Sequence, residues 1–211
     1  MKLKTIPYKE YENNLPQTGK HILCQSNGDS IFVYQAFRNS TAQFAVANQK
    51  FGGPDYSFTR MTWIKPNFLW MMYRSGWAAK PGQENILAIE ISKTNFEKIL
   101  KQAVHSSYKE NIYKTHENWK AQLETSEVRL QWDPDHGPNG DKLERKAIQL
   151  GLRGELLKTF NDEWILSIQN ISEFVVEEKQ KYDNTDPNFM VIEESVLEID
   201  DQDIQRNLEL D

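Results

Sequence analysis

The chain has 211 residues and a formal net charge of −6, with 38% hydrophobic and 11% aromatic residues. This length suits one domain, and the hydrophobic fraction is sufficient for a core. No apolar run approaches the roughly 20 residues of a membrane span, and residues 1–14 lack the apolar segment of a signal peptide. We therefore expect a soluble cytoplasmic protein with no membrane partner. The single cysteine, Cys24, excludes an internal disulfide and a cysteine-based zinc site.

Charge is distributed unevenly along the chain. Residues 184–211 hold nine acids and one base, a net charge of −8, whereas residues 1–183 hold 22 acids and 24 bases, a net charge of +2. The acidic segment is typical of a solvated interaction tail, but its apolar residues between 189 and 199 indicate that part of it docks. Alternatively, the tail covers a basic site and competes with an anionic ligand. The slightly basic body argues against extensive binding of duplex DNA, which needs a broad basic face.

The first half of the chain predicts a short succession of elements. Residues 1–20 are polar and contain two prolines, so we expect an irregular lead-in. An Asn-Gly pair between two apolar segments predicts a hairpin over 21–34. The remaining elements expected here are a helix over 35–49, a loop over 51–57, an extended segment over 58–64, and a buried Trp- and Met-rich helix from Pro66 to about Tyr73, ended by Gly76.

The second half predicts strands and helices without a strict βαβ alternation. Strands are expected at 86–92, 127–133, 147–152 and 164–171. Helices are expected at 93–104, 115–125, 154–164 and 172–182, with a loop at 134–141. The pattern favours a single α+β domain over 21–183, in which a mixed sheet of short strands packs with several helices.

No motif names a reaction. The chain has no Walker loop, no GxGxxG, no HExxH and no GxSxG. Asp133, Asp135 and His136 form the one cluster that resembles a metal site. Loops rich in Asp, Pro and Gly are more often simple turns, so we predict no metal.

Cations recur beside aromatic and amide side chains. Residues 58–77 hold three tryptophans, three methionines and three cations. Long cations are rarely fully buried unless paired, so these either reach out to solvent, pair with acids in an ordinary core, or line a pocket. Arginine binds phosphate through its planar fork, and aromatic rings stack on bases. We predict an aromatic-lined cationic cleft with these ligand-binding residues: Tyr34, Gln35, Arg60, Trp63, Lys65, Arg74, Gln131, Arg145, Gln149 and Arg153.

The expected ligand of this cleft bears phosphate: a nucleotide, a dinucleotide such as NAD, or a nucleic-acid end. Arg60, Lys65 and Arg74 would bind the phosphate, and Tyr34 or Trp63 would stack on a ring. If the protein is an enzyme, Asp133 or Glu155 is the expected acid–base group, and one version is an ADP-ribosyltransferase-like transferase. The alternative is a non-catalytic RNA- or protein-interaction module regulated by the acidic tail.

Five runs of sequence resemble one family in order from about residue 21 to 172. They are VYQAF (33–37), RMTWIKPNFLWMMYRSGW (60–77), QWDP (131–134), IQLGLRG (148–154) and WILSI (164–168). The family is an uncharacterised bacterial and fungal one, catalogued as domain of unknown function 4291. The resemblance implies a shared site without naming its chemistry.

The chain departs from the pattern of this family at two places. The family pattern has an arginine, a small residue, a tyrosine and an acid where this chain has Leu23, Cys24, Ser26 and Asn27. It also has an arginine after QWDP, where this chain has Asp135 and His136. If those groups are catalytic in the family, the resemblance implies an altered activity or substrate here.

Overall fold

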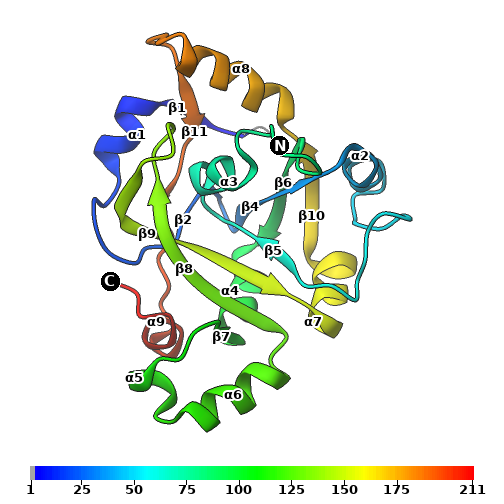
Figure 1. Ribbon diagram of the computed structural model, residues 1–211, viewed down its shortest axis with the longest axis vertical. Helices are drawn as coiled ribbons and strands as arrows, with labels where there is room; N and C mark the ends of the chain where they lie inside the picture. Colours follow the sequence, from blue (N-terminus) through cyan, green and yellow to red (C-terminus); the bar gives the residue numbers. More distant parts are fainter. Residues whose placement is uncertain (1–2) are drawn as a thin grey trace.

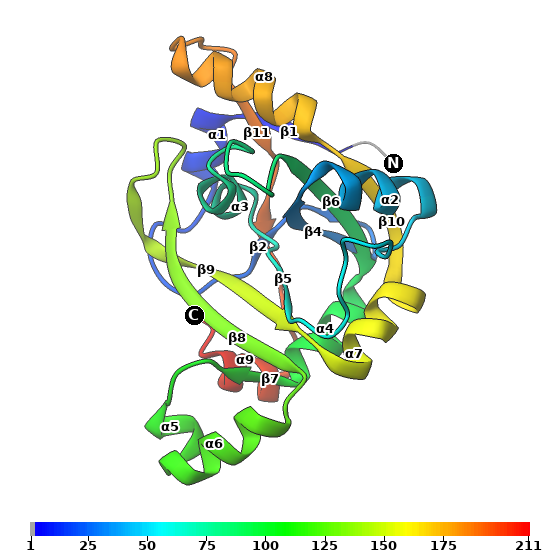
Figure 2. The same cartoon turned by 45° about the vertical axis from the view of Figure 1, so that its right-hand side comes forward.

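The computed structural model of the chain describes residues 3–211 as a single α+β domain built on two four-stranded sheets (Figures 1 and 2). The first sheet is antiparallel and has the order β10-β6-β4-β3. Its strands are β3 (Ser26–Asn27), β4 (Ser30–Phe37), β6 (Asn85–Ser92) and β10 (Ile165–Asn170). Gly28, with φ at 59°, makes the turn between β3 and β4, so the predicted hairpin turn is confirmed.

The second sheet has the order β5-β9-β8-β7. Its strands are β5 (Thr62–Ile64), β7 (Ala103–His105), β8 (Val128–His136) and β9 (Lys142–Leu152). The β7–β8 pair is parallel, and the other two pairs are antiparallel.

Two short sheets attach the ends of the chain to the body. They pair β1 (Thr5–Pro7) with β11 (Met190–Ile192), and β2 (Leu23–Cys24) with β12 (Ser195–Val196). Residues 3–20, which we expected to be irregular, therefore contain β1 and the helix α1 (Tyr8–Asn14). The partner of β1 lies more than 180 residues away in sequence, and local patterning carries no signal of such a pairing.

Helices cover the sheets, and none of those within residues 3–211 combines the length and apolar character needed to cross a membrane. The remaining helices are α2 (Asn39–Asn48), α3 (Phe68–Ser75), α4 (Lys93–Lys101), α5 (Glu110–Tyr113), α6 (His116–Thr125), α7 (Gly154–Thr159) with a π-helical turn at Phe160–Trp164, α8 (Ser172–Asp183) and α9 (Gln202–Leu208).

Side-chain alternation divides the first sheet between two hydrophobic clusters. Ile31 and Val33 of β4 pack into a cluster shared with the second sheet, α4 and α9. Phe32 and Tyr34 point the other way, into a cluster formed with α1, α3 and α8. The inner faces of β8 and β9 also join the first cluster. Their other faces remain available for polar side chains.

The predicted buried helix rich in Trp and Met is confirmed as α3. The side chain of Asn67 caps its first turn by accepting a hydrogen bond from the backbone N–H of Trp70 at 2.6 Å. Gly76 ends it with φ at 60°, as the sequence predicted. Glu194 of the C-terminal segment accepts a further bond from the backbone N–H of Phe68 at 2.6 Å. These contacts fix the direction in which α3 presents its side chains.

Several predicted boundaries differ from the structure; among them, the strand expected at 147–152 begins at Lys142, because β9 pairs with β8 as far as that residue. The helix expected over 35–49 begins only at Asn39, since β4 continues to Phe37 along β6. The helix expected over 93–104 ends at Lys101, and β7 follows it alongside β8. The loop expected over 134–141 is shorter, because β8 extends to His136.

Candidate functional site

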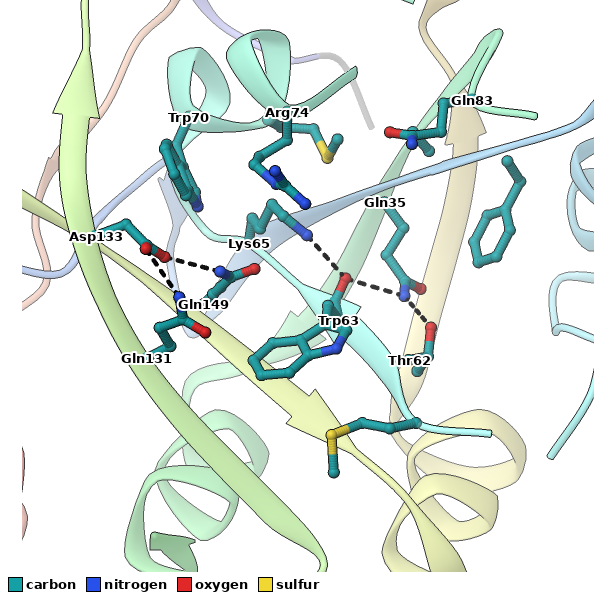
Figure 3. Close-up of a pocket in the computed structure, with 14 residues that line it drawn as sticks. Gln35, Thr62, Trp63, Lys65, Trp70, Arg74, Gln83, Gln131, Asp133 and Gln149 are labelled. Atoms are coloured by element: carbon teal, nitrogen blue, oxygen red, sulfur yellow. Dashed lines mark hydrogen bonds between the residues drawn. The ribbon is translucent and has the colours of Figure 1, made fainter. Parts of the chain in front are cut away.

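A cavity of about 420 Å³ opens where the two sheets meet (Figure 3). At this junction the backbone of Tyr34 in β4 exchanges two hydrogen bonds with Lys65, which follows β5, at 2.7 and 3.1 Å. The walls come from β4, β5, α3, β8 and β9. The cavity therefore draws on segments from residue 35 to residue 149, which only the tertiary fold brings together.

Two cations converge on this cavity from different elements. Lys65 is 7% exposed, and its ammonium donates one long hydrogen bond, to the carbonyl of Trp63 at 3.4 Å. Arg74 reaches in from α3, one turn after Trp70, and Figure 3 shows its guanidinium directed toward the same space. Neither residue takes part in an ion pair between the described residues. Burial, aided by the charge of Arg74, lowers the pKa of Lys65 to about 8.

A single carboxylate, that of Asp133, faces these cations among the residues that line the cavity. Its two oxygens accept hydrogen bonds from the side-chain amides of Gln131 at 2.9 Å and Gln149 at 2.7 Å. Asp133 and Gln131 share one face of β8, and Gln149 lies opposite Gln131 on β9. The carboxylate is thus oriented by neutral donors and keeps free lone pairs for a ligand.

Two buried polar atoms at the cavity have no hydrogen-bond partner among the described residues. Gln35 donates from its amide nitrogen to Thr62 Oγ1 at 2.6 Å and to the Trp63 carbonyl at 3.2 Å, which leaves its oxygen unpaired. The indole N–H of Trp70 is also unpaired. Buried polar groups are normally satisfied, so unpaired ones at a cavity indicate a position for a polar ligand.

The indole of Trp63 lies against the backbone of β9 at Gly151, its partner across the sheet. A Cβ atom at position 151 would lie 3.1 Å from Cε2 of Trp63 and 2.5 Å from Sδ of Met61. A side chain at this position would first displace the thioether of Met61 and would also press on the edge of the indole. The ring therefore forms a flat, half-buried surface beside the cavity.

The structure brings together seven of the residues predicted from the sequence: Gln35, Trp63, Lys65, Arg74, Gln131, Asp133 and Gln149. Tyr34 does not join them, because strand alternation turns it into the second hydrophobic cluster, edge-on to Phe68. Its neighbour Gln35 faces the cavity instead.

Four other predicted residues also lie outside the cavity, so the arginines do not converge on one point. Arg60 is exposed before β5. Arg145 is buried in an ion pair with Asp135 at 2.6 Å. Arg153 donates to the carbonyls of Glu124 and Ser126, and Glu155 pairs on the surface with Lys158. Each has a structural contact or a solvated position of its own.

The Asp133, Asp135 and His136 cluster is not arranged as a metal site. Asp133 faces the cavity, Asp135 pairs with Arg145, and the His136 ring stacks on Tyr73 with centroids 3.5 Å apart. Among residues 3–211, no group of three His, Cys, Asp or Glu side chains is arranged to hold a metal ion.

The residues that depart from the family pattern do not line the cavity. Leu23 and Cys24 are buried in β2, and burial raises the pKa of the Cys24 thiol to about 12, far from that of a reactive thiolate. His136 does not line the cavity, but its ring stacks on Trp70, which does.

Sequence reasoning missed two polar residues that line the cavity, Thr62 and Gln83. Thr62 had a usable signal, since it lies inside the Trp-rich run and next to Trp63. Gln83 lies in the turn before β6, where nothing in the sequence distinguishes it from an ordinary surface glutamine.

Fold and site together define an α+β protein with two four-stranded sheets and a polar, two-cation cavity at their junction. The chain belongs to the family described as Domain of unknown function (DUF4291), which matches residues 21–196. The resemblance read from the five sequence runs is therefore confirmed. No curated protein matches the chain in sequence.

Proposed function

We propose that the cavity binds a phosphate-bearing ligand of the nucleotide type. The observation that carries this proposal is the ammonium of Lys65, which is 7% exposed, pairs with no carboxylate of the described residues and lies beside Arg74. Asp133 favours the charged form of Lys65 but forms no ion pair with it, and an anionic ligand in direct contact would offset much of the remaining cost of burying the ammonium. A phosphate group supplies both the charge and several acceptor oxygens.

The rest of the cavity suits the other parts of a nucleotide. The exposed face of Trp63 offers a stacking surface for a base. The Asp133 carboxylate accepts hydrogen bonds from sugar hydroxyls. The unpaired oxygen of Gln35 accepts from an exocyclic amine or a carboxamide. A volume of about 420 Å³ falls in the usual range of small-molecule sites.

Thermal-shift titrations with inorganic phosphate, AMP, ADP, ATP and NAD test this proposal. A ligand at about 100 times its Kd adds about 2.7 kcal/mol to the stability of the folded state. We expect a shift with at least one nucleotide that Lys65→Met and Arg74→Ala each abolish. The matched control is Arg60→Ala, which removes an exposed arginine outside the cavity. Absence of any shift, or equal loss in the control, refutes the proposal.

A transferase acting on NAD is a second candidate, supported by the position of Asp133 among neutral amides beside the two cations. In such a reaction the bond from ribose C1′ to nicotinamide breaks, and nicotinamide leaves with the electron pair. An acceptor hydroxyl or amine forms the new bond to C1′, and its proton passes to Asp133. The carboxylate also stabilises the cationic character of the sugar in the transition state.

Release of nicotinamide, measured by mass spectrometry with candidate acceptors present, distinguishes this activity from binding alone. We expect Asp133→Asn to lose product formation while it retains NAD binding. If NAD binds and no nicotinamide is released under any condition, the protein is a binding module and the transferase proposal fails.

A further inference from the structure

The cavity occupies one end of a longer polar face on the second sheet. Arg129, Gln131 and Asp133 alternate along one face of β8, opposite to the residues that join the hydrophobic core. Asp133 lies four steps along the strand from Arg129, a distance of about 13 Å. The face therefore extends well beyond the volume of the cavity itself.

Cross-strand pairing connects this extension to the stacking surface. Arg129 lies directly opposite Gly151, and Gly151 lies directly opposite Trp63. The indole, the glycine and the arginine thus form one row across β5, β9 and β8. Gly151 has no side chain, and the thioether of Met61 and the edge of the Trp63 indole occupy the space above its backbone between β5 and β8.

A second arginine continues the series. Arg153 follows Gly151 by two residues in extended backbone, which places its side chain on the same face. It donates from Nε and Nη2 to the carbonyls of Ser126 and Glu124 at 2.9 and 2.6 Å, so its position is fixed. Its charge, after burial, contributes to lowering the pKa of Arg129.

These two arginines have no acidic partner among residues 3–211. Nη1 of Arg129 is buried and makes no hydrogen bond to the described residues. The nearest acid in sequence, Glu127, accepts hydrogen bonds from the backbone N–H groups of Glu155 and Leu156 at 2.8 and 2.9 Å. Its carboxylate is committed to the first turn of α7 and forms no ion pair with either arginine.

We propose that this face of the second sheet binds a single-stranded nucleic acid. Its terminal phosphate lies between Lys65 and Arg74, a base stacks on Trp63, and the following phosphates contact Arg129 and Arg153. The inference rests on the proposed function and specifies its substrate class.

The spacing and chemistry of the face favour a flexible strand over other polyanions. Successive rows of side chains along a strand are about 7 Å apart, a step that a stretched single strand can follow with one phosphate per row. An aromatic ring between cationic groups is the arrangement by which proteins bind single strands without reading sequence. A duplex is disfavoured, because the body outside residues 184–211 has a net charge of only +2.

Fluorescence anisotropy with labelled tetrauridylate that carries a terminal phosphate tests the inference, with the deoxy counterpart as a second probe. Uridine monophosphate serves as the short competitor, and oligoglutamate as a polyanion without bases. We expect the tetranucleotide to bind more tightly than the monophosphate and oligoglutamate to compete poorly. Its logarithmic affinity should fall with the logarithm of salt concentration by about 0.7 per phosphate contact.

Variants separate this inference from the proposed function. Arg129→Gln should lower the affinity for the tetranucleotide and leave the affinity for the monophosphate unchanged. It should also reduce the slope of logarithmic affinity against logarithmic salt concentration by about 0.7. Lys65→Met should lower the affinity for both the tetranucleotide and the monophosphate. Arg206→Gln, which removes an exposed arginine of α9, is the charge-matched control and should change neither. Thermal melting of each variant verifies its fold.

The outcomes are distinct. If the monophosphate binds but Arg129→Gln leaves tetranucleotide affinity and salt slope unchanged, the strand inference fails and the nucleotide site stands. The strand inference is also overturned if oligoglutamate binds as tightly as the tetranucleotide. If neither the monophosphate nor the tetranucleotide binds the wild-type protein, both the strand inference and the proposed function fail.

Discussion

Replacing Lys65 by methionine should stabilise the free protein while it abolishes ligand binding. Methionine retains most of the side-chain volume and removes the charge. The pKa of Lys65 is lowered from 10.5 to about 8 in the folded protein, chiefly by burial. At 1.36 kcal/mol for each pKa unit, the charged form costs the fold about 3 kcal/mol at pH 7. We expect Lys65→Met to gain about 1–3 kcal/mol, since its own packing will not be ideal.

The pH dependence identifies the cause of that gain. Between pH 8 and 10.5 the unfolded chain still binds a proton at Lys65 that the folded chain has released, so the free energy of unfolding rises with pH. The penalty is fully present below pH 8 and disappears by about pH 10.5. The advantage of the variant over the wild type should therefore shrink steadily across this window.

Urea unfolding of both proteins at pH 7, 8.5 and 9.5 measures this difference directly. Taking the difference cancels the ionisations that the two proteins share. Lys120→Met, at an exposed site on α6, is the control and should change stability by less than about 0.5 kcal/mol at each pH. A loss of stability in Lys65→Met would mean that the ammonium is satisfied by the fold, and the reasoning for an anion site would collapse.

Three further outcomes follow from the structure. Affinity for a phosphate ligand should be nearly constant between about pH 7 and 8, where the phosphate is doubly ionised, and fall above pH 8, up to tenfold per pH unit, as Lys65 loses its proton; a flat titration by calorimetry from pH 7 to 9.5 would exclude Lys65 from the phosphate site. Gly151→Ala should displace the thioether of Met61 and shift the adjacent indole of Trp63, which changes its fluorescence and weakens ligand binding at a cost of about 1–3 kcal/mol in stability; unchanged emission and affinity would show that the indole does not depend on this contact. Deletion of residues 184–211 removes seven buried apolar side chains (Phe189, Val191, Ile192, Leu197, Ile199, Ile204 and Leu208), each contributing about 1.5–3 kcal/mol; circular dichroism should show loss of the fold, and a folded, more active product would support an autoinhibitory tail instead.

Local patterns in the sequence predicted much of the fold where the signal was itself local. The apolar run from Phe68 to Met72, with Asn67 before it and Gly76 after it, leads to α3 by propensity and capping alone. Strand alternation in β8 placed Gln131 and Asp133 on a common face, opposite to Val128 and Leu130. The same rule shows why Tyr34 and Gln35 cannot both face the cavity, although it does not say which of them does.

Pairings between distant segments had no local signal. Nothing near Thr5 indicates that its strand pairs with Ile192, and nothing near Arg145 indicates that Asp135 neutralises it. The lack of a local signal explains why some arginines predicted to bind the ligand lie outside the cavity. A buried arginine with a carboxylate partner and an arginine aimed at a ligand have the same sequence context, and only the tertiary contacts separate them.

The structure gives a different explanation for the contrast in net charge between residues 1–183 and the acidic residues 184–211. Glu209 pairs with Lys20 at 2.6 Å and Lys109 at 3.3 Å, and Asp201 pairs with Lys101 at 2.8 Å. These contacts join the two ends of α9 to Lys20, to the end of α4 and to the start of α5, and no residue of 184–211 lines the cavity. The tail acids thus help to dock the segment on the body, while Lys65 and Arg74 keep no acid partner among the described residues. The acidic segment therefore does not cover the cavity, and an anionic ligand there would meet Lys65 and Arg74 without competition from the tail.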